Sequence, residues 1–269
     1  MASTLVSFHA HPDDECISTG GTIAKAAADG HRVVAVFATR GEHGEVDDGV
    51  LADGETLAER RIAETARAAE ILGVERVEFL GYRDSGMDGT PENDAEGSFW
   101  SADLDEAAGR LAAVLREEDA AVLTVYDERG GYGHPDHIQV HRVGVRAAEL
   151  AGTPRVYEAT VNRDAARRAI AEQRDAALAS GIELPEGFED PESFDIGMPE
   201  ALITTEVDVR DYVERKRSAL AAHASQVDET SWFLAMPVEA FNQFFGQEWF
   251  IRRGAAVATD GWETSLWDE

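Results

Sequence analysis

The sequence contains little that would tie it together by disulfides or hold it in a membrane. Its 269 residues include one cysteine, Cys16, which excludes an internal disulfide framework. No apolar run approaches the length of a membrane span, and the N-terminal residues lack the basic region of a signal peptide. We therefore expect a cytoplasmic protein with no membrane partner, built as one large domain or as one domain with an appended lobe.

Positive charge is also scarce. Lys25 and Lys216 are the only lysines, and 53 acidic residues against 24 lysines and arginines give a formal net charge of -29. Nucleic acids and anionic membranes are bound through basic patches, so neither is expected as a partner. We interpret the acidic surface as a solvated background that favours solubility. The sequence contains no indication of the oligomeric state.

The first 160 residues alternate between short β-rich runs and Ala-rich amphipathic segments. Strands are predicted at 5–8, 32–38, 76–80, 121–125 and 155–160, and helices at 21–28, 56–72, 102–117 and 136–150. This alternation predicts a parallel sheet with helices on both faces, joined by right-handed crossovers. The predicted fold class is α/β, with a Rossmann-like doubly wound, mostly parallel sheet and a smaller C-terminal lobe.

Beyond residue 160 the alternation becomes less regular. The pattern predicts a helix at 163–180, a loop at 181–199, a strand at 201–207 and a helix at 209–222, followed by a tryptophan-rich tail. We predict that residues 1–160 form a Rossmann-like catalytic core. Residues 161–269 are expected to complete the fold and to cap the substrate crevice.

Polar side chains follow four of the predicted strands at the point where each strand ends. The carboxyl ends of parallel strands form the ligand crevice of open α/β sheets, so these residues are expected to converge. They are His11, Asp13, Asp14 and Glu15 after the first strand, Glu42, His43 and Glu45 after the second, Tyr82, Arg83, Asp84 and Met87 after the third, and Tyr126, Asp127, Tyr132, His134, Asp136 and His137 after the fourth.

Two of these clusters have the composition of a zinc site. Zinc favours imidazole nitrogen and carboxylate oxygen, and a catalytic site leaves one position for water. On a tight turn, His11 and Asp14 can reach one ion, and His137 from the second cluster would complete a three-ligand open site. A lone His-Pro-Asp is usually only a turn, and Asp13 or Glu15 could be helix N-caps.

Other residues with the same chemistry are interpreted as structural. They are His9, His31, His43, His141 and Cys16. The metal interpretation is kept for the two clusters because they match each other at matching strand ends.

The same two clusters carry a resemblance to a known family. The string AHPDDE at residues 10–15 and the string GHPDH at 133–137 resemble the two metal motifs of the LmbE-like, or PIG-L, family of zinc N-deacetylases. The resemblance spans roughly residues 4–160, with weaker agreement near 219–226. The strings YRDSGM at 82–87 and GGYG at 130–133 are most similar to the mycothiol branch, which holds a deacetylase of N-acetylglucosaminyl-inositol and an amidase of mycothiol conjugates.

The resemblance implies a role for each motif residue. It makes His11, Asp14 and His137 the ligands of one zinc ion per chain. It makes Asp13 the general base that accepts a proton from the attacking water. Asp136 is expected to support the histidine that follows it.

Further residues are assigned to the transition state and to the substrate. His134, held charged by Asp136 and nearby carboxylates, is expected to stabilise the oxyanion or to protonate the leaving amine, although Asp13 could return its proton instead. Tyr132 is expected to approach the reacting carbonyl. Residues expected to contact the sugar are Arg61, Asp84 and Glu45.

The expected function is removal of the acetyl group from a small molecule that contains N-acetylglucosamine, with N-acetylglucosaminyl-inositol favoured. One alternative is an amidase that cleaves a mycothiol conjugate or a similar amide with the same core. Another is a sugar-binding zinc protein without catalysis. The presence of Asp13 and His134 argues against this last class, because neither residue is needed to hold the metal.

Overall fold

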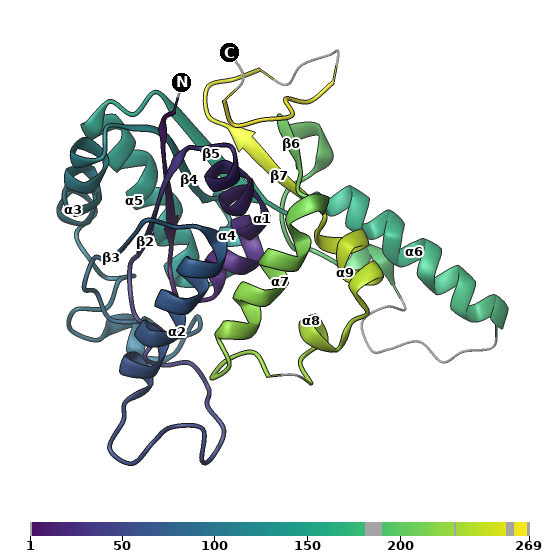
Figure 1. Cartoon of the computed structure of the whole chain (residues 1–269), viewed down its shortest axis with the longest axis horizontal. Helices are drawn as coiled ribbons and strands as arrows, with labels where there is room; N and C mark the ends of the chain where they lie inside the picture. The colour runs from purple at the N-terminus through teal and green to yellow at the C-terminus, as the bar shows by residue number, and fades with distance from the viewer. Residues whose placement is uncertain (1, 181–189, 229, 257–260, 268–269) are drawn as a thin grey trace.

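The computed structural model describes residues 2–180, 190–228, 230–256 and 261–267. Within them the chain forms a seven-stranded sheet in the order β3-β2-β1-β4-β5-β7-β6, with helices on both sides (Figure 1). No helix among the described residues is long and apolar enough to cross a membrane.

Five neighbouring strands are parallel. They are β1 (Thr4–His9), β2 (Arg32–Phe37), β3 (Arg76–Phe79), β4 (Ala120–Tyr126) and β5 (Arg155–Thr160). β1 lies at the centre and all its residues are buried, as expected where helices cover both faces of a parallel sheet. The order 3-2-1-4-5 is that of doubly wound folds, so the predicted fold class is confirmed.

The far edge of the sheet is antiparallel and comes from the C-terminal half of the chain. β7 (Gln247–Arg252) pairs antiparallel with β5 and with β6 (Thr205–Asp208). β7 was not predicted, because a short aromatic run in a tail has no alternating pattern to mark it as a strand. The strand predicted at 201–207 is shorter and begins later, after the 3-10 turn η3 (Glu200–Leu202). Residues 1–160 and 161–269 thus contribute to one sheet.

Two sets of helices cover the two faces. α3 (Leu104–Glu117) and α5 (Pro135–Ala151) share one apolar core with the sheet, and α1 (Asp14–Ala28), α2 (Leu57–Leu72) and α7 (Val213–Ala222) share the other. α1 was predicted from residue 21 but begins at residue 14, directly after the first motif. That motif therefore lies in the tight turn from β1 into a helix, and it is part of the scaffold as well as of the site.

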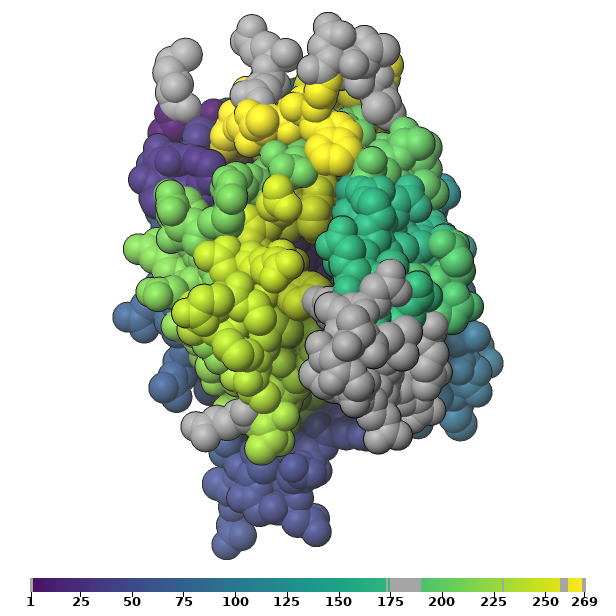
Figure 2. Space-filling view, turned by 90° about the vertical axis from the view of Figure 1, so that its right-hand side faces the viewer, coloured from purple at the N-terminus to yellow at the C-terminus, as the bar shows by residue number. Residues whose placement is uncertain are grey.

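The remaining elements connect these layers. They are α4 (Gly130–Gly133), α6 (Arg163–Ser180), α8 (Trp232–Ala235), α9 (Val238–Phe245) and the 3-10 turns η1 (Pro91–Asp94), η2 (Pro191–Ser193) and η4 (Arg210–Tyr212). α6 points away from the sheet in Figure 1, as its label at the right shows. Figure 2 shows α6 beside the segment of α8 and α9, with the loop between β2 and α2 projecting below. Of the loop predicted at 181–199, residues 181–189 lie outside the described residues.

Candidate metal centre

Three buried side chains from the two motifs converge at the carboxyl ends of β1 and β4. His11 follows β1, Asp14 opens α1 and His137 lies in the first turn of α5, where Pro135 begins the helix. The Asp14 carboxylate lies between the two imidazoles, with Oδ2 3.4 Å from Nδ1 of His11 and Oδ1 3.4 Å from Nε2 of His137. Potential ligand atoms of all three residues lie within 4.8 Å of one another.

This arrangement fits a metal ion. Nε2 of His137 is buried without a hydrogen-bond partner among the described residues, which costs free energy unless something binds there. The donor set of two imidazoles and one carboxylate is one that zinc accepts. On the other side of the His11 ring, Nε2 lies 3.1 Å from Oδ2 of Asp136. A proton on Nε2 leaves the Nδ1 lone pair to face Asp14, as carboxylate partners of metal-binding histidines usually arrange.

Asp136 therefore supports a different histidine from the predicted one. It was expected to support His137, the residue after it, but its Oδ2 contacts His11 and accepts the backbone N–H of Ser85 at 2.9 Å. The side chain is fully buried. Consecutive residues of a helix point in different directions, so Asp136 at the start of α5 faces β1 while its neighbour faces Asp14.

Asp13 lies in the turn before α1, and its side chain does not cap the helix. Its backbone has φ 94° and ψ -31°, a conformation that only glycine adopts without strain. Its Oδ2 lies 3.0 Å from Nη2 of Arg61. Burial raises the pKa of Asp13 to about 6, although the Arg61 guanidinium opposes the shift. A carboxylate with such a pKa is suited to accept a proton near neutral pH.

His134 was expected to be charged, but its surroundings favour the neutral ring. Burial, together with the nearby His11 and His137, lowers the pKa of His134 to about 4, although Asp136 and Asp84 act in the opposite direction. Its Nδ1 accepts the backbone N–H of Asp136 at 3.1 Å, so the ring proton is on Nε2. His134 is thus arranged as a neutral hydrogen-bond donor.

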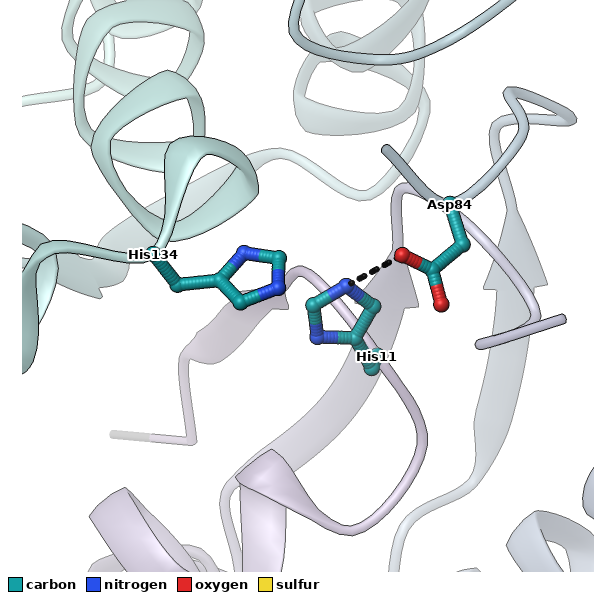
Figure 3. Close-up of side chains that lie close together, drawn as sticks. All are labelled: His11, Asp84 and His134. Atoms are coloured by element: carbon teal, nitrogen blue, oxygen red, sulfur yellow. Dashed lines mark ion pairs between the residues drawn. The ribbon is translucent and has the colours of Figure 1, made fainter. Parts of the chain in front are cut away.

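Asp84 lies on the opposite side of His11 from His134 (Figure 3). Its Oδ1 is 3.5 Å from Nε2 of His11. Its two oxygens also accept the backbone N–H groups of Gly86 at 2.9 Å and His43 at 3.1 Å. The loop after β3 is therefore attached to the motif after β1 through one buried carboxylate.

Arg61 is buried in α2 and is not a surface charge. Its guanidinium donates to the carbonyl of Gly41 at 3.1 Å, to the carbonyl of Pro12 and to Asp13. Only 3% of the residue is exposed. These contacts connect α2 to the turn that carries the first motif.

The other two predicted residues lie farther out. Tyr132 is 55% exposed, and its ring centroid is 5.0 Å from that of His137 and 6.3 Å from that of His134. It therefore covers the outer side of the two histidines. Glu45 is exposed on the loop after β2, and its backbone carbonyl accepts a hydrogen bond from Nε2 of Gln226 at 3.0 Å.

The residues interpreted as structural lie outside the three-residue set. His31 stacks on Trp267 with centroids 3.8 Å apart, and Nδ1 of His141 contacts the carbonyl of Tyr126 at 3.0 Å. His9 is buried behind the site and contacts the hydroxyls of Ser7 at 2.7 Å and Tyr126 at 3.0 Å. His43 lies on the loop after β2, where its backbone N–H binds Asp84.

Sequence reasoning missed one residue beside the site. His223 caps the C-terminal end of α7, is fully buried, and places Nε2 2.7 Å from Oε1 of Glu15. Glu15 was expected among the polar residues at the end of the first strand, but its only suggested role was that of a helix cap. The weak agreement with the family near 219–226 was the one signal that pointed to this segment. Cys16 is buried beside the pair, and its thiol donates to Oε1 of Glu15 at 3.3 Å.

Comparison with known proteins agrees with this geometry. Residues 6–148 match the family model described as PIG-L, GlcNAc-PI de-N-acetylase. A protein of Acidothermus cellulolyticus named 1D-myo-inositol 2-acetamido-2-deoxy-alpha-D-glucopyranoside deacetylase is 43% identical over 99% of this chain and 94% of its own length. A protein of Catenulispora acidiphila with the same name, numbered 1, is 42% identical over 96% of this chain and 86% of its own.

Solved structures share the fold at lower identity. The N,N'-diacetylchitobiose deacetylase of Pyrococcus horikoshii has a TM-score of 0.63 at 23% identity and covers 96% of this chain and 88% of its own. GalB, the 4-carboxy-2-hydroxymuconate hydratase of Pseudomonas putida, has a TM-score of 0.60 at 21% identity, with 95% and 98% covered. The fold thus occurs in a hydratase as well as in deacetylases and does not by itself specify a reaction. The family match and the relatives above 40% identity do show the family: the chain belongs to the PIG-L de-N-acetylases.

Proposed function

We propose that this protein is a zinc-dependent hydrolase that removes the acetyl group from N-acetylglucosaminyl-inositol. The observation that carries the proposal is the agreement of two features. Relatives named as deacetylases of this compound match 96–99% of the chain at 42–43% identity. The side chains of His11, Asp14 and His137 lie close enough together to hold one ion, and the carboxylate of Asp13 lies in the adjoining turn, against Arg61.

One zinc ion per chain is proposed to bind to His11, Asp14 and His137. When bound, zinc would lower the pKa of water and polarise the amide carbonyl. The buried, unpartnered Nε2 of His137 supports this site, and so does the contact between Asp136 and the far nitrogen of His11.

The residues around the ligands can supply the proton transfers. Asp13 accepts a proton from the attacking water as the water oxygen bonds to the carbonyl carbon. The tetrahedral oxyanion requires hydrogen-bond donors, and Nε2–H of His134 and the hydroxyl of Tyr132 are proposed to supply them. Because Nδ1 of His134 accepts the backbone N–H of Asp136 and burial lowers the pKa of the ring, we assign protonation of the leaving amine to Asp13, which returns the proton it received as the C–N bond breaks.

The sugar is proposed to bind at the rim of this site. Asp84 and Glu45 are candidates for contacts with its hydroxyls. Arg61 was expected to make such a contact as well. Because its Nη2 lies 3.0 Å from Oδ2 of Asp13, its main proposed role is to hold the carboxylate of the base.

The C-terminal segment is proposed to cap the crevice. Residues just before the strand β6 pack on the loop that carries Tyr132. The N–H of Gly197 donates to the carbonyl of Gly131 at 2.9 Å, and Asp195 pairs with Arg129 at 2.6 Å. These two contacts support the proposal that this segment caps one side of the site.

Product analysis with the zinc-loaded protein tests the proposal. N-acetylglucosaminyl-inositol, N-acetylglucosamine oligomers and a mycothiol conjugate are incubated separately, and released acetate and free amine are measured. Acetate release is expected from the first compound above the others, and it should be lost in the Asp13→Ala variant. Cleavage of the conjugate alone would show an amidase, and absence of any cleavage would contradict hydrolysis of these amides.

A further inference from the structure

We propose that the buried pair Glu15 and His223 is a positioning device that holds Asp13 in its strained conformation. Nothing in the comparisons assigns a role to either residue. The inference rests on the proposed function, because it requires Asp13 to be the base.

The backbone of Asp13 is the first observation. Among the described residues, Asp13 and Asp119 are the only ones other than glycine with positive φ. A strained conformation of this kind persists only where the surrounding structure enforces it, and such residues cluster at functional sites. The Asp13 carboxylate lies against Arg61 in α2 and does not cap α1, while Asp14, the next residue, is in the helix.

Glu15 holds this turn from inside the protein. Its Oε2 accepts the backbone N–H of Asp13 at 2.8 Å, across two residues of the same turn. Glu15 is 2% exposed, so its carboxylate needs partners within the protein. Oε1 obtains them from Nε2 of His223 at 2.7 Å and from the thiol of Cys16 at 3.3 Å.

His223 brings this contact from a distant part of the chain. It caps the C-terminal end of α7, 208 positions after Glu15, and it is fully buried. Nδ1 of its ring has no hydrogen-bond partner among the described residues, so the polar contact of the ring is the one with Glu15. A buried imidazole and carboxylate contribute less to stability than a well-packed apolar pair of similar volume would. An apolar pair, however, could not orient the carboxylate of Glu15 by a hydrogen bond.

Arg61 completes the arrangement from the other side. It binds the carboxylate of Asp13 and the carbonyl of Pro12, whereas Glu15 binds the N–H of Asp13. The base is therefore fixed at its backbone and at its side chain by two independent groups. Loss of either group should displace the carboxylate, and small displacements of a reacting group lower the rate of the chemical step more than they lower substrate binding.

Two substitutions of His223 test the proposal. His223→Leu should lower kcat on the order of 10–100-fold, with KM and zinc content unchanged. His223→Gln should recover most of kcat, because the amide nitrogen of glutamine can donate from nearly the position of Nε2. Ser225→Ala is the matched control. Ser225 anchors the same segment by donating to Glu64 at 2.7 Å and contacts neither Glu15 nor Asp13, so kcat should be unchanged.

A double-mutant cycle tests whether His223 acts through Asp13. In the Asp13→Ala background, His223→Leu should cause no further loss of activity. A further loss by the same factor as in the wild type would overturn the inference, and so would full kcat in His223→Leu.

If the leucine variant does not fold, His223→Asn replaces it, because asparagine is too short to reach Glu15. Equal kcat in the Asn and Gln variants would also overturn the inference. Full activity of Asp13→Ala alone would instead overturn the proposed function.

Discussion

Two adjacent aspartates at the start of α1 have different surroundings, and the turn between β1 and the helix is the cause. Asp14 has entered the helix, and its Oδ2 accepts the N–H of His11 at 2.9 Å, so its carboxylate is held against the two imidazoles. Asp13, with φ 94°, is turned toward Arg61. The backbone conformation of one residue thus separates the proposed metal ligand, Asp14, from the proposed base, Asp13.

The strain at Asp13 can be measured by comparing two variants that both lack the carboxylate. Asp13→Gly should be more stable to unfolding than Asp13→Ala, by about 1 kcal/mol, because glycine adopts positive φ without strain. Urea denaturation measures the difference. Ala24 in the middle of α1 is the control position: there glycine should be less stable than alanine by roughly 0.5–1 kcal/mol. An Asp13→Ala variant as stable as the glycine variant would contradict the strain.

Residue types and spacing were sufficient to predict part of the site. His11, Asp14 and His137 could be predicted because each follows a recognisable strand and the two motifs match. The direction of the Asp136 side chain and the lowered pKa of His134 could not, because they depend on burial and on neighbouring residues. The same holds for His223, whose contact with Glu15 has no local pattern in the sequence.

Among the secondary-structure elements, α5 carries the second motif and packs closely on β4. Gly144 makes this approach possible: a Cβ added there would lie 2.3 Å from Cγ1 of Val125 in β4. His137 is on the same helix, so the distance between α5 and β4 also sets how far His137 reaches toward Asp14.

The Gly144→Ala substitution should therefore have two effects. The overlap with Val125 should lower the free energy of unfolding by about 1–3 kcal/mol, and the shift of α5 should weaken zinc binding. Gly109→Ala in α3 is the matched control, since a Cβ there meets no atom within 4 Å. That change should stabilise the protein by roughly 0.5–1 kcal/mol and leave zinc affinity unchanged. Thermal unfolding and competition with a chelator measure the two quantities, and equal stability of both variants would contradict the close approach.

The elements that sequence reasoning placed correctly are those with regular local patterns. The parallel strands are short apolar runs between amphipathic helices, and their periodicities differ clearly. The start of α1 was placed too late because the motif of histidine, proline and aspartates was interpreted as a loop. β7 was missed because its place at the sheet edge follows from pairing with β5, some ninety positions earlier in the chain, and not from its own composition.

For the whole molecule, residues of the C-terminal half support the site that the N-terminal half forms. Residues beyond 160 supply β6 and β7 to the common sheet, and α7 packs against α1 and α2. Through His223 and Gln226 the same region reaches the turn that holds the first motif and the guanidinium of Arg61. The net charge of -29 is a property of the whole surface, whereas the charges at the site are buried and paired with one another.

The most direct test of the account measures zinc content and acetate release together in the wild type, His137→Ala and His134→Ala. His137 is a proposed ligand, so its loss should remove zinc. His134 binds the backbone of Asp136 through Nδ1 and is proposed to act on the oxyanion, so its loss should leave zinc in place and lower kcat. The account predicts about one zinc per chain in the wild type and in His134→Ala, little in His137→Ala, and low acetate release from N-acetylglucosaminyl-inositol in both variants. Equal zinc loss in the two variants, or full acetate release by zinc-free His137→Ala, would contradict it.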